Sequence, residues 1–483
     1  MPRPPTSLRE FMSYALLPFD FTRIPGTPKY LATNFAGESC LLSRDDLFGL
    51  VERRLSVDSD LYATLISKHF ITSPDSTAPL HLLAAKYRTR RRFRPDLASL
   101  HIFVVTLRCN QACNYCQVSH RAQHEVDMDM PAATADAAVD FAFQGPAPAI
   151  KIEFQGGEPL LVFEIVRRVV EAAEERARRD QRTVEFVLCS NLYALQPDHL
   201  DYIAKHKIAV STSLDGPQPL HDQNRIALGG ASHEHVARSI GLTREHIGPD
   251  QVAALMTTTR SSLGQPEAIV DEYLRLGFRS IVLRPLNPYG FAARQWATLG
   301  YSTDEWLDFY RRALAYIIQV NQQGVLFRED FSAFFLRRML TPFGDGYVDL
   351  QSPTGCGLSV LVYNHDGGIY LSDESRMLAA MGDHTFRFGT VGETRFSDFV
   401  LDPRFLALVD ETMCEGMPEC IECSFREYCG SDPVRQHRVS GDFVGSKAGA
   451  DHCHRVRSVV GHLAELLDSN PTTRDVLMSW ISP

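Results

Sequence analysis

The chain has 483 residues, of which 44% are hydrophobic and 22% charged, a composition ordinary for a soluble protein of about two to four domains. Its net charge of −10 and its pI near 5.9 argue against a nucleic-acid-binding protein that relies on a global positive field. No apolar run approaches the roughly 18 residues of a membrane span, and the N-terminus has no apolar signal core, so we expect a cytoplasmic protein that does not cross a membrane. The 11 cysteines are clustered, which in such a protein indicates metal binding rather than disulfides.

Residues 1–85 are expected to form a small domain of their own. Two β-rich segments, 30–34 and 39–42, flank a turn signal and predict a hairpin, and two helices are predicted over 45–51 and 60–69. This order of hairpin and helices resembles the winged-helix peptide-recognition elements of enzymes that modify ribosomally made peptides. Such elements bind a leader peptide as an extra strand at a sheet edge. A stabilising N-terminal cap is the alternative that the pattern leaves open.

A basic run over 86–95 follows, within the segment 86–100. Runs of like charge are mostly solvated, so we interpret 86–100 as a linker. The alternative is a patch that steers an acidic peptide or a flavodoxin-type electron donor toward an otherwise acidic protein.

Three cysteines, Cys109, Cys113 and Cys116, form a C-x3-C-x2-C loop directly after an apolar, β-branched run at 101–107. The run predicts a buried strand, so the thiols are expected at the carboxyl end of a strand, where α/β folds place their chemistry. Three thiolates can hold three irons of a [4Fe–4S] cluster and leave the fourth iron open to an outside ligand. A zinc site that lacks one ligand, or a chance spacing, is the alternative.

Two further signals accompany the loop. Tyr115 stands just before its last cysteine, and Gly156, Gly157 and Glu158 begin a Gly-Gly-Glu-Pro sequence after a second β-rich run. Together they resemble the radical S-adenosylmethionine (radical SAM) superfamily, in which the open iron binds the amino and carboxylate groups of SAM. The resemblance implies that the two glycines let the backbone approach the ligand closely. It also implies that Glu158 accepts hydrogen bonds from the SAM ammonium group.

From residue 101 to about residue 320, β-rich runs alternate with segments of helical periodicity. This alternation predicts an α/β fold with a parallel, partly closed barrel of six βα units. A radical SAM core is such a barrel, so the resemblance extends over 101–320. The six strands are expected at 101–107, 149–154, 183–189, 208–213, 251–258 and 279–284.

Polar residues follow the third and fourth of these strands: Ser190, Asn191, Ser213, Asp215 and Arg225. The last three belong to a Ser-Leu-Asp-Gly-Pro…His-Asp…Arg stretch that resembles one in the radical SAM family. There the serine and arginine help to hold the ribose or the carboxylate of SAM, and a guanidinium suits a carboxylate. We therefore assign all five residues to cofactor binding. Asp215 could instead cap the next turn, and Cys189 is expected in the core.

Helices over 321–350 are expected to connect the barrel to a cysteine-rich domain, 351–483. Four cysteines of this domain have a C-x2-C-x5-C…C spacing: Cys420, Cys423, Cys429 and Cys453. They resemble the SPASM domain, which binds auxiliary iron–sulfur clusters. Four thiolates would fully ligate one [4Fe–4S] cluster, which would relay electrons or position substrate rather than bind SAM. A zinc ribbon is the alternative.

A second auxiliary cluster is left open by the sequence. Of the further cysteines that the SPASM pattern needs, Cys356 is in place, whereas Ser372 stands at another expected position. Cys414 is an additional cysteine and a candidate ligand, and Asp373 or Asp432 could supply carboxylate ligands. Asp373 also matches an acidic residue that serves as a base toward the substrate in sulfatase-maturing relatives. The resemblance therefore implies a catalytic role for Asp373.

Over almost its full length the chain is most similar to the His-Xaa-Ser system radical SAM maturases of the B type. The stretches that carry this resemblance are 17–19, 23–26, 86–89, 101–119, 189–192 and 429–433. The resemblance implies a ribosomally made precursor peptide with His-Xaa-Ser repeats and companion maturases. The chemistry implied also needs a low-potential electron donor of the flavodoxin or ferredoxin type.

The expected function is reductive cleavage of SAM to a 5′-deoxyadenosyl radical, followed by oxidation of the peptide, for example to a crosslink. An auxiliary cluster would accept the second electron. Two other classes stay open: a radical SAM enzyme that acts on a small molecule, and a non-catalytic iron–sulfur scaffold.

Overall fold

The computed structural model describes residues 14–92, 96–227, 229–343, 347–447 and 449–481. Several predicted segments reach beyond these ranges. The first 13 residues of the expected N-terminal domain, the end of the basic run, 93–95, and residues 344–346 of the expected connecting helices lie outside the described residues. So do residue 228 of the expected barrel and residues 448 and 482–483 of the expected cysteine-rich domain. Among the helices within the ranges, none combines the length and the apolar character needed to cross a membrane.

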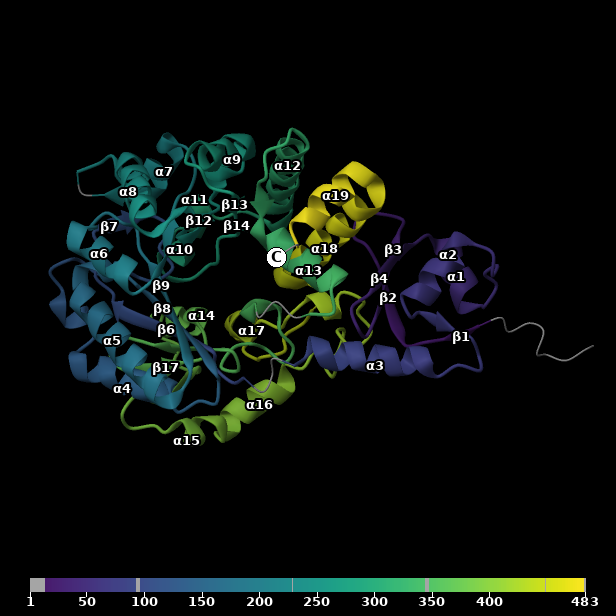
Figure 1. Ribbon diagram of the computed structural model, residues 1–483, viewed down its shortest axis with the longest axis horizontal. Helices are drawn as coiled ribbons and strands as arrows, with labels where there is room; N and C mark the ends of the chain where they lie inside the picture. Colours follow the sequence, from purple (N-terminus) through teal and green to yellow (C-terminus); the bar gives the residue numbers. More distant parts are fainter. Residues whose placement is uncertain (1–13, 93–95, 228, 344–346, 448, 482–483) are drawn as a thin grey trace, which may run out of the picture.

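Within the described residues, nine strands form one central sheet (Figure 1). Six of them are parallel and lie side by side in chain order, which confirms the predicted α/β class with a parallel core. These six are β6 (Leu100–Thr106), β8 (Ala149–Gly156), β9 (Thr183–Cys189), β10 (Ala209–Ser213), β12 (Val252–Thr257) and β14 (Leu283–Arg284). The last predicted strand is divided, because β13 (Ser280–Ile281) pairs with β15 (Arg328–Glu329) outside the central sheet.

Helices alternate with the parallel strands along the chain. They are α4 (Ala132–Ala142), α5 (Phe163–Asp180), α6 (Pro197–Lys205), α7 (Gln218–Asn224), α8 (Ser232–Ile247), α9 (Pro266–Arg275) and α12 (Thr303–Gln322). In α5, Val166, Val169 and Ala173 recur at helical spacing and are fully buried, so one face of the helix packs on the sheet. At the start of α12, Ser302 and Glu305 form a capping box that satisfies the first amides of the helix.

The C-terminal part of the chain continues the barrel sheet. β16 (Val360–Tyr363) runs parallel to β6 and extends the sheet beyond the β6 edge of the six parallel strands. β17 (Gly368–Tyr370) and β18 (Arg387–Thr390) follow antiparallel. Every residue of β16 is buried, as expected of a strand with neighbours on both sides. The remaining helices of this part are α13 (Asp330–Leu340), α14 (Asp373–Ala379), α15 (Phe396–Val400), α16 (Pro403–Glu411), α17 (Pro433–Ser440), α18 (Asp451–Ser469) and α19 (Pro471–Ser479).

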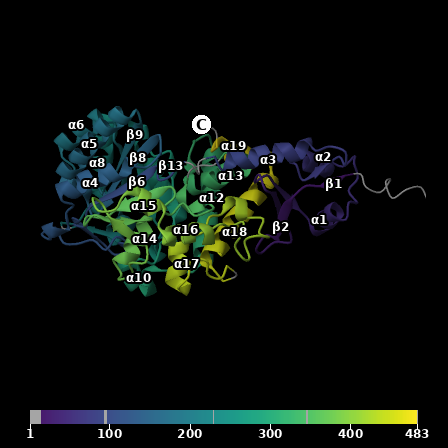
Figure 2. The same ribbon diagram turned by 90° about the horizontal axis from the view of Figure 1, so that it is seen from below.

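The N-terminal part contains the predicted hairpin and both predicted helices, around a small buried core that includes Tyr14, Leu50 and Phe70. Its elements are β1 (Ala15–Leu16), β2 (Phe19–Arg23), β3 (Tyr30–Asn34), β4 (Ser39–Leu42), α1 (Arg44–Val51), α2 (Asp60–Ser67) and β5 (Ile71–Thr72). β2 adds a third strand to the hairpin, which the sequence pattern did not indicate. Both views place α18 and α19 between this part and the barrel (Figures 1 and 2).

The basic run does not form the solvated linker that its charge indicates. Helix α3 (Ala78–Arg90) extends into it and reaches from the N-terminal part toward the C-terminal part (Figure 1). The Arg90 guanidinium is buried, donates to the carbonyl oxygen of Ala36 at 2.7 Å and lies 3.9 Å from the Glu427 carboxylate. Arg91 lies 3.2 Å from the same carboxylate. Arg90 and Arg91 therefore connect the N-terminal part to the C-terminal part through the buried Glu427 carboxylate.

Replacing Arg90 by alanine is expected to lower the free energy of unfolding by about 3 kcal/mol or more. The substitution removes a cation from beside the buried Glu427 carboxylate and a donor from the Ala36 carbonyl. Urea denaturation measures the change. Arg88→Ala is the matched control, because Arg88 lies in the same helical turn but is exposed, and its loss is expected within about 0.5 kcal/mol. Equal losses in the two variants would contradict the role of Arg90.

Candidate functional site

The cysteine loop follows β6 and is fixed on both sides by distant segments. Its strand β7 (Gln111–Cys113) pairs antiparallel with β11 (Arg225–Ala227). The amide of Phe291 donates to the carbonyl oxygen of Cys116 at 2.8 Å. All three thiols of the loop line one cavity of about 250 Å³ inside the barrel.

Most of the predicted site residues line this barrel cavity. They are Cys109, Cys113, Tyr115, Cys116, Gly156, Gly157, Ser190, Asn191, Ser213, Arg225 and Asp373. Two others, Glu158 and Asp215, lie behind the cavity wall and contact residues that line it. The cysteines of the C-terminal part lie elsewhere.

The surroundings of the three thiols fit a cluster. Burial raises the pKa of each thiol, that of Cys113 to about 12 although Arg225 is close. Because iron is ligated by thiolates, cluster binding here has to release protons. Two donors are aimed at the sulfurs: the Asn191 amide lies 3.8 Å from Cys109 Sγ, and the Arg225 guanidinium lies 3.9 Å from Cys113 Sγ. These residues are suited to hold three irons of a [4Fe–4S] cluster.

The glycine pair is required by the protein backbone. A Cβ atom on Gly156 would lie 2.1 Å from the carbonyl oxygen of Thr106, and one on Gly157 would lie 2.0 Å from that of Arg108. The close approach lets the Gly157 amide donate to Thr106 and the Glu158 amide donate to Arg108, both at 2.8 Å. Close approach of a ligand was the expected reason for the glycines. In the structure they first of all attach the end of β8 to the start of the cysteine loop.

Glu158 is fully buried, and the protein itself supplies its hydrogen-bond donors. Its carboxylate accepts from the Ser190 hydroxyl at 2.7 Å, from the backbone amide of Asn191 at 2.8 Å and from the backbone amide of Leu160 at 3.0 Å. Burial raises its pKa to about 7. Glu158 therefore positions Ser190 and Asn191 in the cavity wall, and a ligand ammonium would compete with three internal donors.

Asp215 orients two lining residues in a similar way. The Tyr115 hydroxyl donates to its carboxylate at 2.8 Å, and the Arg225 guanidinium lies 3.3 Å from it. The same guanidinium stands 5.2 Å from the centre of the Tyr115 ring. Ser213 and Arg225 line the cavity. Asp215 lies behind them and fixes the direction in which the Arg225 side chain points.

Cys189 lines the barrel cavity, although its place in an apolar run suggested the core. Its thiol donates to a carboxylate oxygen of Glu153 at 3.0 Å. A signal for this position exists in the sequence. Phe186 and Leu188 alternate with Glu185 and Cys189 along β9, so the two polar positions share the face that lines the barrel interior. Arg284, at the end of β14, also lines the cavity.

Asp373 is the first residue of α14 and reaches the barrel cavity from the C-terminal part of the chain. Ser372 caps the helix by accepting from the Ser375 amide at 3.2 Å, which fixes the turn that carries Asp373. The carboxylate lies 3.4 Å from the Arg376 guanidinium. An acidic group is thereby held at a defined place in the same cavity as the cysteine loop.

A second cavity, of about 270 Å³, is lined by five cysteines and is called here the five-thiol cavity. Its cysteines are Cys414, Cys420, Cys423, Cys429 and Cys453. A hydrogen bond from Cys414, assisted by the charge of Lys447, lowers the pKa of Cys420 to about 7. Within the described residues, no three metal-ligating side chains converge as they would on a single ion. A water molecule needs about 10–15 Å³, so the cavity is large for one zinc ion.

Cys356 is separated from the other candidate ligands of a second cluster. All eleven cysteines lie in the described residues, and Cys356 is the one among them that lines a third cavity, of about 100 Å³. Cys414 lines the five-thiol cavity, Asp373 lines the barrel cavity, and Asp432 lines both the second and the third cavity. With one thiol, the surroundings of Cys356 do not fit a thiolate-held cluster.

Replacing Gly157 by alanine is expected to lower the free energy of unfolding by about 1–3 kcal/mol, because the new Cβ meets a backbone carbonyl that cannot move alone. The displaced loop should also bind less iron, which an iron assay after anaerobic reconstitution measures. Gly241→Ala is the control, since nothing lies within 4 Å of a Cβ at that helical position. Its expected effect is a gain of up to about 1 kcal/mol. Normal iron binding by the Gly157 variant would contradict the assigned docking role.

Part of the chain is similar in sequence to known proteins. Residues 103–271 match the family model of the radical SAM superfamily. An uncharacterized protein of Methanothermobacter thermautotrophicus is 25% identical over 192 residues, which make up 39% of this chain and 69% of that protein. The serine-type anaerobic sulfatase-maturating enzyme of Bacteroides thetaiotaomicron is 24% identical over 165 residues, 32% of this chain and 39% of that enzyme.

Solved structures resemble the chain over a longer stretch. The anaerobic sulfatase maturase anSMEcpe, with bound AdoMet and Cp18Cys peptide, has a TM-score of 0.63 at 15% identity and covers 79% of this chain and 99% of its own. Streptococcus suis SuiB, bound to the precursor peptide SuiA, has a TM-score of 0.51 at 14% identity and covers 87% of this chain and 95% of its own. The chain therefore matches the radical SAM superfamily in sequence over residues 103–271 and shares its overall fold with these maturases.

Proposed function

We propose that the chain is a radical SAM enzyme that cleaves SAM reductively and oxidises a ribosomally made peptide. The observation that carries the proposal is the barrel cavity, which brings three thiols of one loop and the Asp373 carboxylate to one space although 257 positions (373 − 116) separate Cys116 from Asp373. The sequence match over 103–271 supports the chemistry of SAM, and the fold shared with two maturases supports a peptide as substrate.

The three loop thiols would hold the cluster, and the cavity wall would hold SAM. When bound, the [4Fe–4S] cluster and SAM together supply the one-electron cleavage that yields a 5′-deoxyadenosyl radical. Arg225, held by Asp215, offers a guanidinium to the SAM carboxylate. The hydroxyls of Ser190 and Ser213 are suited to the ribose. The enclosing walls would keep water and loose side chains away from a reactive radical.

We assign Asp373 the role of base toward the substrate. Oxidation of a peptide carbon removes a hydrogen atom, a second electron and, in forming the new bond, a proton. A carboxylate in the same cavity as the cofactor can accept that proton. The second electron would pass to one auxiliary [4Fe–4S] cluster in the five-thiol cavity. A flavodoxin- or ferredoxin-type donor would supply the first electron.

A precursor peptide with His-Xaa-Ser repeats is the first candidate substrate, and a crosslink is the expected product. The resemblance to the B-type maturases supports this choice, and it also makes companion maturases the expected partners. The N-terminal part would bind the leader of the peptide, because β2 and β4 are the edge strands of its described sheet and either could accept another strand. Two candidates remain for the test to exclude: an enzyme acting on a small molecule, and an iron–sulfur scaffold.

Iron analysis tests the assignment of clusters. The reconstituted chain is expected to bind about eight irons, four in each of two clusters. Cys113→Ala and Cys429→Ser should each lose about four irons, since each removes a ligand of one cluster. Cys356→Ser is the matched control, because its thiol lies in a separate cavity, and it should keep the full complement. About twelve irons in the unaltered chain, or a loss of four in Cys356→Ser, would show a second auxiliary cluster.

The activity test is an anaerobic assay for 5′-deoxyadenosine with SAM and dithionite, with and without a His-Xaa-Ser repeat peptide. Production that rises with the peptide, together with a change in the mass of the peptide, is expected. Cys113→Ala should form none, and Asp373→Asn should still cleave SAM but lose at least about 100-fold in product formation. Production that is indifferent to the peptide and to deletion of residues 1–85 would favour a small-molecule substrate. No production from iron-loaded protein would favour the scaffold.

A further inference from the structure

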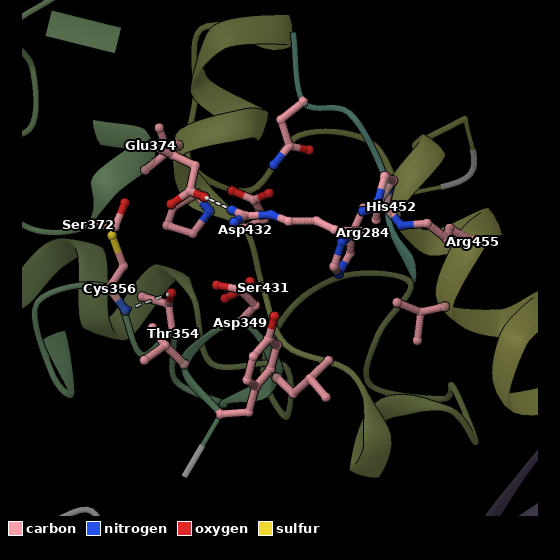
Figure 3. Close-up of a pocket in the computed structure, with 18 of the residues that line it drawn as sticks. Arg284, Asp349, Thr354, Cys356, Ser372, Glu374, Ser431, Asp432, His452 and Arg455 are labelled. Carbon is pink, nitrogen blue, oxygen red and sulfur yellow. Dashed lines mark hydrogen bonds and ion pairs between the residues drawn. The ribbon is translucent and has the colours of Figure 1, made fainter. Parts of the chain in front are cut away.

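The third cavity, around Cys356, is lined by charged and polar groups from several elements together with apolar side chains, and is called here the acidic cavity. Figure 3 shows that Arg284 crosses it toward Glu374 and Asp432. Arg284 and Glu374 form an ion pair at 3.8 Å. The charged residues that line the acidic cavity are Asp349, Glu374, Asp432, Arg284 and Arg455. This set comprises three carboxylates and two guanidinium groups, so the cavity lacks one positive charge.

Without a further cation, retained protons relieve the excess negative charge. Burial, together with repulsion from Asp349, Asp373 and Asp432, raises the pKa of Glu374 to about 8. Burial and the charge of Asp432 also raise the pKa of Asp349. A carboxyl group that retains a proton because a counter-charge is missing can exchange the proton for a bound cation.

A histidine in the wall adds an unused acceptor. His452 is 7% exposed, and its Nδ1 atom has no hydrogen-bond partner among the described residues. Its Nε2 atom lies 3.1 Å from the carbonyl oxygen of Gly430. Because a carbonyl only accepts, Nε2 carries the hydrogen, and in the neutral ring Nδ1 is left as an acceptor. An acceptor without a donor in the wall of a cavity that lacks a positive charge is suited to the N–H groups of a cation.

The acidic cavity adjoins the space in which the proposed chemistry takes place. Arg284 lines both the acidic cavity and the barrel cavity. A further cavity of about 680 Å³ shares Arg284 with both of them and shares Glu374 with the acidic cavity. Asp373, next to Glu374, lines the barrel cavity. A chain that reaches Asp373 from the barrel interior therefore has the acidic cavity within the reach of a long side chain.

We propose that the acidic cavity is a substrate subsite that binds a cationic side chain of the peptide, lysine or arginine, next to the residue being oxidised. The cation would pair with Glu374 and Asp349 and donate to His452. Arg284 forms the wall between this subsite and the barrel cavity. The inference rests on the proposed function for the identity of the ligand as a peptide, but the charge preference of the cavity can be tested without any peptide.

The test uses three probes of similar size: n-butylammonium, n-butyrate and n-butanol. Saturation-transfer NMR titrations on the cluster-loaded full chain measure their dissociation constants. n-Butylammonium is expected to bind at least about tenfold more tightly than either other probe, and Glu374→Gln should weaken it about tenfold. Glu411→Gln makes the same chemical change at an exposed position of α16 and should leave binding unchanged. Tighter binding of n-butyrate would overturn the proposal and assign the cavity to an anion, and so would unchanged n-butylammonium binding in Glu374→Gln.

Two peptides then test the source of the cation. His-Lys-Ser repeats should bind the unaltered chain about tenfold more tightly than His-norleucine-Ser repeats, and Glu374→Gln should remove the difference. If n-butylammonium binds and the two peptides bind equally, the cavity serves a free amine and the peptide assignment is wrong. If 5′-deoxyadenosine forms while n-butylammonium does not bind, the subsite alone is refuted. If n-butylammonium binds and no 5′-deoxyadenosine forms, the proposed function falls, and the assignment to a peptide substrate falls with it.

Discussion

The site depends on the contact by which the end of β8 is attached to the cysteine loop. The amides of Gly157 and Glu158 bind the carbonyl oxygens of Thr106 and Arg108, at a separation that leaves no room for a Cβ atom. The same turn buries the Glu158 carboxylate, which binds Ser190 at the end of β9. Three strand ends are thereby joined by a short chain of hydrogen bonds. A cavity whose walls come from separate strands keeps its shape only when such contacts fix the strand ends to one another.

The second constraint is the continuation of the barrel sheet by the C-terminal part. Because β16 pairs with β6, the segment that carries Asp373 is attached to the same sheet as the cysteine loop, although more than half of the chain separates them. The same pairing places Cys356 and Glu374 beside Arg284, which ends the last barrel strand. The chamber for the proposed chemistry and the acidic cavity are therefore neighbouring spaces in one structure. A substrate could contact both at once.

Several charges of this protein act inside the fold. The basic run of α3 does not form a solvated surface. Instead, Arg90 and Arg91 surround the buried carboxylate of Glu427. Arg225 is paired with buried Asp215 in the same manner, and its Nη1 atom lies 3.9 Å from Cys113 Sγ. The acidic cavity departs from this pattern, since its carboxylates outnumber its guanidinium groups. That imbalance is costly in a buried place unless a proton or a bound cation corrects it.

The sequence by itself determined the features that depend on neighbouring residues. The cysteine spacing, the glycine pair, the six parallel strands and the N-terminal hairpin were all evident from local patterns, because alternation, capping and turn residues act over a few positions. Tertiary structure alone decided which distant segments meet. The pairing of β16 with β6, the burial of Arg90 and the division of Cys414 and Cys356 between two cavities are set by long-range packing. A thiol or a guanidinium has the same local pattern whether it faces a cluster, a carboxylate or water, so its partner is known only once the chain has folded.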